Sequence, residues 1–381
     1  MLRKCTIPFA QPYIGSSEIK GVKHCLRSGW LTTGSRSFEF EKKIGDYIGS
    51  KYNIATSSCT AALHLALKAV GIGPGDEVII SPITFVSAVN AIEYCSGTAV
   101  FADVEEDTLN IDIDSIKNAI TCRTKAIIVT HYGGHACNLE AINELAKQYN
   151  LYVIEDAAHA FGAEYKGKKI GDSNNLVCFS FYATKNITCG EGGMISTNNP
   201  DWIERIKELR LHGMTNDAWN RYSISGSPLY DVNEVGFKYN LTDIAATIGL
   251  EQLKKSEQFL KKRAKIVHQY RHGIKERAIN CRPLAQKTYA KSSNYLFTII
   301  LNEKADRTRV IADLKAARIC TSILFTPVYK FTCYRKKYIL AEKTCPICES
   351  LYSRLISLPI FVGLRSGQVN YVLNMLQKVL Q

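Results

Sequence analysis

The chain has 381 residues, with 48 basic and 35 acidic side chains and a formal net charge of +13. Hydrophobic residues make up 46% and charged residues 22%, which is ordinary for a globular protein and excludes a largely disordered, collagen-like or coiled-coil chain. Residues 251–381 hold 25 basic and 8 acidic side chains whereas residues 1–250 hold 23 and 27, which predicts two domains, 1–250 and 251–381.

From about residue 50 to residue 200 the sequence predicts alternating helices and strands. Thr60–Val70 is rich in good helix formers and apolar on nearly every face, so it predicts a buried helix that the glycines of Gly71–Gly75 end. The next elements are the strand Asp76–Ile80, helix Val86–Tyr94, strands Thr98–Phe101 and Lys125–Thr130, helix Leu139–Tyr149, and strands Leu151–Ile154 and Leu176–Ser180. Apolar strands alternating with helices predict an α/β fold, with a mostly parallel sheet covered by helices on both faces.

The basic C-terminal part predicts a different arrangement. Asp243–Arg277 reads as one long charged helix, which suits a bridge between two domains. Beyond it, the segments Asn294–Leu301, Arg307–Ala317 and Gln368–Leu380 predict strands and helices of a smaller α+β domain.

Several classes of protein and site are disfavoured. No run reaches the ~18 apolar residues of a membrane span, and Met1–Cys5 does not lead into the apolar region of a secretory signal, so a cytoplasmic protein is expected. The thirteen cysteines include Cys95, Cys178 and Cys320 in or beside apolar runs, which favours reduced, buried thiols. Cys345-Pro-Ile-Cys348 is a lone pair with only Cys333 as a further candidate ligand, so no metal site is expected.

Polar residues gather after the predicted strands, where α/β proteins place their chemistry. Thr56–Thr60 precedes a helix and suits either a phosphate site or a simple N-cap. Glu155–His159 supplies a carboxylate that could serve as a ligand, as a base or as the partner of a protonated ring nitrogen, or could simply cap the next turn. Ser180–Asn186 contains Lys185, which is either a nucleophilic amine or an exposed structural lysine. Gly190–Met194 permits a close backbone approach or an ordinary turn.

Taken together, these four groups fit pyridoxal phosphate. The Thr56–Thr60 segment would bind the phosphate, and Lys185 would form a Schiff base with the cofactor. Asp156 would keep the pyridine nitrogen protonated, so that the ring acts as an electron sink. Six segments in this order then resemble the DegT/DnrJ/StrS family of nucleotide-sugar aminotransferases, over nearly the whole chain. They are Ser28–Gly34, Ser57–His64, Glu155–His159, Ser180–Thr188, Gly190–Gly193 and Gly236–Asp243.

The resemblance implies the fold-type I architecture of aspartate aminotransferase and a homodimer with shared active sites. It implies that Lys185 bonds to the cofactor and moves the proton, that Asp156 pairs with the pyridine nitrogen, that His159 lies near the phenolic oxygen and that Phe85 stacks on the ring. The other implied residues are Ser58, Cys59, Thr60 and Ser180 for the phosphate, Lys238 and Asn240 for the neighbouring subunit's phosphate, and Trp30, Leu31, Thr32 and Thr33, with Lys185, for the sugar.

Two positions depart from the family pattern. Many members have glycine at the position of Cys59, but the backbone amide remains, so phosphate binding is expected to survive if the turn avoids positive φ. Many members also have a histidine in the segment that matches Thr321–Pro327, where this chain has Leu324. No sugar-binding role is therefore carried over to that segment.

Lys185 favours transamination, since a related branch that performs dehydration has histidine at this position. The resemblance implies amino transfer from L-glutamate to C4 of a UDP-4-keto-6-deoxyhexose, giving a UDP-4-amino-4,6-dideoxyhexose. The alternatives are a UDP-4-keto-pentose or a dTDP- or GDP-linked keto sugar, then a dehydratase, and last a non-catalytic regulator that binds nucleic acid through the basic C-terminal part. Because the basic groups Lys254–Lys255, Lys261–Arg263 and Arg335–Lys337 are separate, neither a nucleic acid nor a membrane is expected as a partner.

Overall fold

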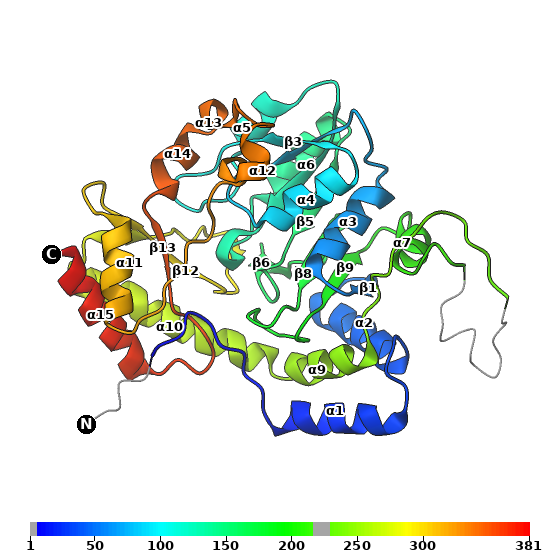
Figure 1. Ribbon diagram of the computed structural model, residues 1–381, viewed down its shortest axis with the longest axis horizontal. Helices are drawn as coiled ribbons and strands as arrows, with labels where there is room; N and C mark the ends of the chain where they lie inside the picture. The colour runs from blue at the N-terminus through cyan, green and yellow to red at the C-terminus, as the bar shows by residue number, and fades with distance from the viewer. Residues whose placement is uncertain (1–5, 216–228) are drawn as a thin grey trace.

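The computed structural model describes residues 6–215 and 229–381, and within them the main body is built on a seven-stranded sheet (Figure 1). In spatial order its strands are β1 (Tyr52–Thr56), β9 (Gly193–Thr197), β8 (Leu176–Ser180), β5 (Tyr152–Asp156), β4 (Thr124–Thr130), β2 (Glu77–Ile80) and β3 (Thr98–Phe101). From β8 to β3 neighbouring strands are parallel, while β9 is antiparallel to both β8 and β1. The predicted α/β fold with a mostly parallel sheet is confirmed.

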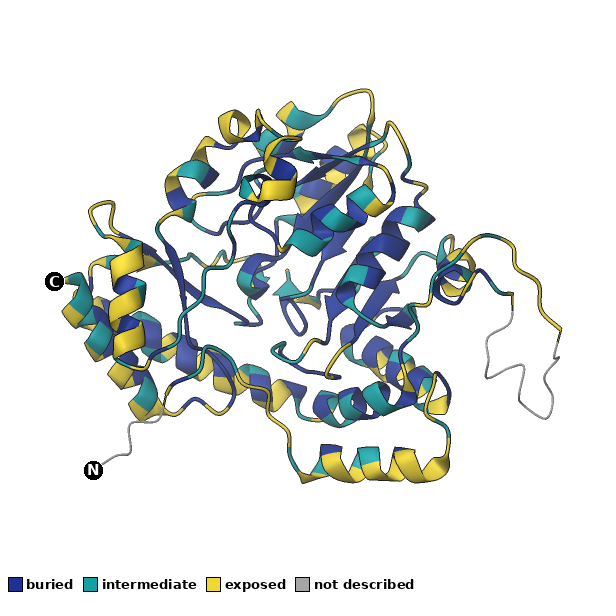
Figure 2. Ribbon diagram, in the orientation of Figure 1, coloured by how far each residue is buried: buried dark blue, intermediate teal, exposed yellow. Residues whose placement is uncertain are grey.

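Side chains from the two faces of this sheet enter two different hydrophobic clusters, because successive residues of a strand point to opposite faces. In β4, Ile128 packs with one cluster and Ile127 with the other. Helices α3 (Cys59–Ala69), α4 (Val86–Tyr94) and α7 (Ile203–Arg210) cover the first face. Helices α2 (Ser35–Ile48), α5 (Ile113–Ala119), α6 (Leu139–Gln148) and α9 (Asp243–Leu253) cover the second. The sheet is buried between these layers (Figure 2).

The expected elements between residues 60 and 180 are present with small shifts at their ends. The predicted helix at 60–70 is α3, and the predicted strand at 151–154 is β5, which extends to Asp156. The expectation of one helix over Asp243–Arg277 is wrong. The chain forms α9 and then α10 (Ser256–Glu276), with a break at Lys254 and Lys255.

A buried carboxylate explains where this break falls. Glu18 lies on α1 (Ser16–Ser28), which packs against α9, and its side chain is 2% exposed. It accepts hydrogen bonds from Nε2 of Gln252 (2.7 Å) and from Nζ of Lys255, which also forms an ion pair with it. The chain therefore turns between the two helices, and this turn places Lys255 against Glu18 of α1.

The basic C-terminal part contains a third hydrophobic cluster, on the left of Figure 1. Helix α10 packs there with α11 (Arg307–Ala316), α15 (Ser366–Leu380) and an antiparallel sheet of β10 (Cys281–Pro283), β12 (Phe297–Leu301) and β13 (Leu355–Leu358). The remaining short elements are β6 (Glu164–Tyr165), β7 (Lys168–Lys169), β11 (Ala290–Lys291), η1 (Tyr132–Gly134), η2 (Val328–Lys330), α12 (Thr332–Arg335), α13 (Ala341–Thr344) and α14 (Pro346–Tyr352). Tyr329, Tyr334 and Cys348 pack in the cluster of α3 and α4, and the division at residue 250 stays a prediction.

Cysteine and membrane features can be placed on this fold. Cys95, Cys178, Cys345 and Cys348 are buried free thiols, whereas Cys333 is exposed. Within the described ranges no three His, Cys, Asp or Glu side chains are grouped so that they could hold a metal ion. Among the helices described, none has the length and apolar character that crossing a membrane requires.

The environment of Glu18 makes the stability of the protein depend on pH. Burial raises the pKa of Glu18, but the hydrogen bonds from Lys255, Gly15 and Gln252 outweigh it and lower the pKa to about 2. The stabilisation is therefore present above pH 4.5 and is lost as the pH falls from 4.5 toward 2. We expect Glu18→Gln to lower the free energy of unfolding at pH 7 by roughly 1–3 kcal/mol, measured by urea denaturation.

The pH series carries the sharper test. The difference between wild type and Glu18→Gln should shrink as the pH falls from 4.5 toward 2, because Glu18 of the unfolded chain is protonated first and that of the folded protein then begins to be protonated. Glu39→Gln, which removes an exposed ion pair with Arg36, is the matched control and should change the free energy of unfolding by less than about 1 kcal/mol. A difference for Glu18→Gln that stays constant from pH 7 to pH 2.5 would contradict the assignment.

Candidate active site

The carboxyl ends of three parallel strands bring the predicted site residues to one edge of the sheet. Thr130 at the end of β4 is opposite Asp156 at the end of β5, and Asp156 is opposite Cys178 of β8. Ser180 ends β8, and the following turn, in which the amide of Lys185 donates to the carbonyl of Tyr182 (3.0 Å), carries Lys185 back toward that edge. Lys185 lies close enough for its charge to act on the pKa of Asp156.

Helix α3 begins at the same edge. Ser58 is its N-cap, and the Ser58 hydroxyl accepts from the amide of Ala61 (3.1 Å). A cap therefore exists, yet the amides of Cys59 and Thr60 remain without intrahelical partners, as at every helix start. Cys59 is absent from the residues with positive φ, so it meets the condition under which a side chain can replace glycine here. At Gly193 of β9, an added Cβ would lie 2.4 Å from the carbonyl oxygen of Ser58, so this strand packs directly against the helix start.

Asp156 is a buried carboxylate, 4% exposed. Its Oδ1 accepts from the amide of Ala158 (3.0 Å), and Sγ of Cys59 lies 4.0 Å from the same oxygen. Burial raises the pKa of Asp156, and the Ala158 amide and the charge of Lys185 offset this only in part. A cation brought to this carboxylate would compensate for the desolvation of its charge.

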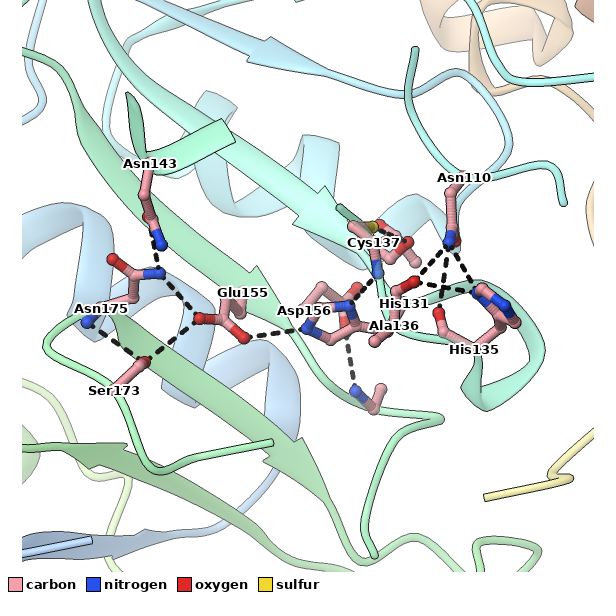
Figure 3. Close-up of polar contacts among 12 residues, drawn as sticks. Asn110, His131, His135, Ala136, Cys137, Asn143, Glu155, Asp156, Ser173 and Asn175 are labelled. Carbon is pink, nitrogen blue, oxygen red and sulfur yellow. Dashed lines mark hydrogen bonds and ion pairs between the residues drawn. The ribbon is translucent and has the colours of Figure 1, made fainter. Parts of the chain in front are cut away.

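The neighbouring carboxylate, Glu155, is satisfied within the protein (Figure 3). It accepts from Nε2 of His131 (2.9 Å), from Asn175 (2.8 Å) and from Ser173 (3.2 Å). The other ring nitrogen of His131 accepts from the amide of Cys137 (3.1 Å), which assigns the ring proton to Nε2. This network fixes the end of β5 and with it the position of Asp156.

A row of four neighbouring rings runs across the site from Phe85 to Tyr295. Phe85, at the start of α4, lies 6.0 Å from the ring of Phe325, and Phe325 stacks on His159 at 5.7 Å. His159 in turn stacks on Tyr295 at 4.4 Å, and Nζ of Lys185 lies 4.5 Å from the centroid of the Tyr295 ring. Phe85, at one end of this row of rings, is 57% exposed, so its ring is accessible to a bound molecule.

The polar groups at this edge fit pyridoxal phosphate. Nδ1 of His159 is buried and has no hydrogen-bond partner in the described part of the chain. Burial, together with the charge of Lys185, lowers the pKa of His159 well below its usual range, so the imidazole is neutral. A neutral ring with an unused nitrogen suits a phenolic oxygen, the buried Asp156 suits a protonated ring nitrogen, and the start of α3 suits a phosphate.

The loop predicted to border the sugar is tied to the loop predicted to reach the neighbouring subunit. Oγ1 of Thr33 accepts from Nδ2 of Asn240 (2.6 Å) and donates to the carbonyl of Leu241 (2.5 Å). The buried carboxylate of Asp243 accepts from the amides of Gly34 (2.8 Å) and Ser37 (2.9 Å). Acidic capping of α2 thereby joins two segments that are about 200 residues apart in the sequence.

The other residues of these two loops are more open. Leu31 is 43% exposed and Thr32 is exposed, while Nε1 of Trp30 donates to the carbonyl of Thr33 (3.0 Å). Lys238 is exposed, and its backbone forms a bridge with Leu211. The structure thus brings Ser58, Cys59, Thr60, Phe85, Asp156, His159, Ser180 and Lys185 to one edge, with the 30–33 and 238–240 segments linked beside Thr56.

Sequence reasoning missed three groups in this site. Tyr295 and Phe325 enter from the C-terminal part of the chain and contact His159. Their segments carry no charged or glycine-rich signature that would have singled them out. His131 follows the predicted strand that ends at Thr130, so its place after a strand was a usable signal.

Comparison with known proteins agrees with this geometry. The family model described as "DegT/DnrJ/EryC1/StrS aminotransferase family" matches residues 12–377. The chain is 45% identical to MJ1066 of Methanocaldococcus jannaschii, covering 100% of this chain and 99% of that protein. It is 40% identical to the spore coat polysaccharide biosynthesis protein SpsC of Bacillus subtilis, covering 98% and 97%.

Solved structures give the same result. The putative sugar aminotransferase Spr1654 from Streptococcus pneumoniae, in its PMP-form, superposes with a TM-score of 0.91 at 31% identity, covering 98% of each chain. The same protein is also known in a PLP-form, with a TM-score of 0.90. The chain therefore belongs to the DegT/DnrJ/EryC1/StrS aminotransferase family, as a sugar aminotransferase whose cofactor is pyridoxal phosphate.

Proposed function

We propose that the protein transfers an amino group from L-glutamate to C4 of a UDP-linked 4-keto-6-deoxyhexose, giving a UDP-4-amino-4,6-dideoxyhexose. The observation that carries this proposal is the meeting of the Lys185 amine, the buried Asp156 carboxylate and the start of α3 at one edge of the sheet. The amino-acid sequences of Trp30–Gly34 and Tyr239–Asp243 resemble those of the family branch that acts at C4 of UDP-sugars. The name of the relative SpsC supports an amino sugar made for a polysaccharide.

The start of α3 would hold the cofactor's phosphate. The amides of Cys59 and Thr60 would donate to it, helped by the positive end of the helix dipole. The Ser58 hydroxyl accepts from Ala61 and so keeps its own proton for the phosphate, and the hydroxyl of Ser180 would donate from the end of β8. Lys238 and Asn240 would complete the phosphate site of the neighbouring subunit.

Pyridoxal phosphate supplies an electron sink and a temporary carrier for the amino group. Asp156 would hold the pyridine nitrogen in its protonated state, and its charge would be compensated by that contact. His159 would bind the phenolic oxygen through a ring nitrogen, and Phe85 would cover one face of the pyridine ring. Lys185 would anchor the cofactor and then, as a free amine, move a proton at the carbon that loses or gains the amino group.

The sugar would lie beside the 30–33 segment. Leu31 and Thr32 are exposed there, and the Trp30 ring is fixed by its bond to the Thr33 carbonyl. Thr33 itself is buried and bonded to Asn240, so it would shape this loop more than contact the sugar.

The reaction is tested by incubating the purified protein with pyridoxal phosphate, L-glutamate and a panel of UDP-, dTDP- and GDP-4-keto sugars, including a UDP-4-keto-pentose. Mass spectrometry should detect an amine product with UDP-4-keto-6-deoxyhexose, together with an equal amount of 2-oxoglutarate. Lys185→Ala should lose both the visible absorption band of the lysine-bound cofactor and turnover, because the amine whose charge acts on both Asp156 and His159 is then gone.

Two results would redirect the proposal. Product from another sugar nucleotide only would correct the substrate but keep the reaction. An unchanged visible band in Lys185→Ala would remove Lys185 from its role. Lys147→Ala, at a lysine in the last turn of α6, is the matched control and should keep both band and turnover.

Asp156→Asn separates cofactor binding from cofactor activation. The amide keeps the size of the side chain and a hydrogen bond to the cofactor, but it loses the charge that favours a protonated pyridine nitrogen. We expect the variant to retain bound cofactor and to transaminate at least ~100-fold more slowly, as removal of an electrostatic contact to a reacting group typically costs. Turnover within a factor of two of wild type would contradict the assignment.

The homodimer with shared sites is tested by mixing two inactive variants. If Asn240 serves the neighbouring subunit, a dimer of one Lys185→Ala chain and one Asn240→Asp chain holds one intact site. When an equimolar mixture is unfolded and refolded, about half of the dimers should contain one chain of each variant. In each of these mixed dimers one of the two active sites is intact. The mixture should therefore recover about a quarter of the wild-type activity. Each variant refolded by itself is the control, and a mixture no more active than the two controls would contradict sharing.

A further inference from the structure

Tyr295 enters the site from the C-terminal part of the chain and is fixed at both its backbone and its hydroxyl. It is buried and lies just before β12. Its amide donates to the carbonyl of Gly133 (3.1 Å), and its carbonyl accepts from Nη1 of Arg263 (3.4 Å). The hydroxyl pairs with Oγ1 of Thr184 at 3.2 Å, one residue before Lys185. The ring therefore has little freedom to move away from Lys185.

Arg263 is an unusual support for this position. Its side chain is 2% exposed, and its Nη1 also lies 3.5 Å from the carbonyl of Asn294 and 3.4 Å from the carbonyl of Ile360. Burial lowers the pKa of Arg263 to about 10, so the group remains charged at neutral pH. A buried guanidinium is costly to desolvate, and here its charge is directed to backbone carbonyls that set the path of the chain around Tyr295.

The Tyr295 ring carries two contacts toward the reaction site. Nζ of Lys185 lies 4.5 Å from its centroid, within the range in which the negative face of an aromatic ring attracts an ammonium group. The imidazole of His159 stacks on the ring at 4.4 Å with an interplanar angle of 28°. One side chain thus touches both residues proposed to meet the cofactor at its reactive end.

We propose that Tyr295 is a positioning residue of this aminotransferase, whose ring holds the free Lys185 amine and the His159 imidazole in place. The inference rests on the roles of Lys185 and His159 under the proposed function. A lysine side chain has four rotatable bonds, and each turnover requires its amine to leave the cofactor and to return to the same position. The ring limits the positions that the free amine samples, and His159 keeps one orientation of its unused ring nitrogen.

The first measurement uses the protein without cofactor. Amines are acetylated with a water-soluble reagent, and the rate at each lysine is read by peptide mass spectrometry. We expect Tyr295→Leu to raise the rate at Lys185 several-fold, because the ring that contacts the Lys185 amine no longer shields it from the reagent. Tyr295→Phe keeps the ring and should match wild type, and exposed Lys275 serves as the reference in every sample.

The second measurement uses the enzyme with cofactor, glutamate and keto sugar. We expect Tyr295→Leu to lower kcat about tenfold or more while KM for the sugar changes less than about threefold, because the ring acts on Lys185 rather than on the substrate. Tyr295→Phe should recover most of kcat. Tyr270→Phe is the matched control for Tyr295→Phe, because Tyr270 is also buried, stacks on Phe297 and donates its hydroxyl to the carbonyl of Pro359 away from the site.

The outcomes separate this inference from the proposed function. Wild type with no activity on any keto sugar would overturn the proposed function, while acetylation in the cofactor-free protein still reports the contact between ring and amine. Equal acetylation of Lys185 in Tyr295→Leu and wild type, or a change confined to KM, would overturn the role of Tyr295. If Tyr295→Leu does not fold, Tyr295→Met fills more of the volume without a ring and is held to the same two criteria.

Discussion

Two adjacent buried carboxylates at the end of β5 are the constraint on which the site depends. Consecutive residues of a strand point to opposite faces, so Glu155 and Asp156 meet different environments. Glu155 receives bonds from His131, Asn175 and Ser173 and is fully used inside the protein. Asp156 receives one from the Ala158 amide and a long one from the Cys59 thiol (4.0 Å), both at Oδ1, and retains acceptor capacity. The strand therefore supplies a fixed support through Glu155 and a buried negative charge through Asp156. A bound cation would compensate that charge, and the protonated pyridine nitrogen of the cofactor is such a cation.

Buried charges also join parts of the chain that are distant in sequence. Glu18 links α1 to the turn between α9 and α10, and Asp243 links the start of α2 to α9. Each is bonded by several donors, as a buried charge must be if it is not to destabilise the fold. The segments that surround the site are thus held by a few acidic and basic side chains, while the hydrophobic clusters hold the sheet and its helices.

The sequence was most informative where local pattern and burial agree. Apolar helix formers located α3, and continuous apolar runs located β2, β4, β5 and β8, because the two-sided burial of a parallel sheet leaves a strong local signal. The break at Lys254 and Lys255 left none, because it depends on a carboxylate more than 200 residues away. A propensity argument cannot include such a contact.

In the candidate site, too, residues with a local sequence signal could be predicted, and residues placed by distant contacts could not. Asp156, Lys185 and the start of α3 could be expected together, since parallel strands end at one edge. The roles given to His159, Phe85, Lys238 and Asn240 came from family resemblance and remain proposals. Tyr295 was not predictable, because its place beside Lys185 is set by Thr184, Gly133 and Arg263, which come from three separate parts of the chain.

The partners of Arg263 have a consequence for the order of folding. Its Nη1 contacts the carbonyls of residues 294, 295 and 360, so this set of contacts is complete only after segments about 30 and 97 residues away have arrived. Contacts between segments this far apart in sequence form more slowly than contacts within one helix or turn, because closing them costs more chain entropy. A nascent chain that has not yet emerged to residue 360 therefore lacks one of the three carbonyl contacts by which Arg263 sets the path of the chain around Tyr295.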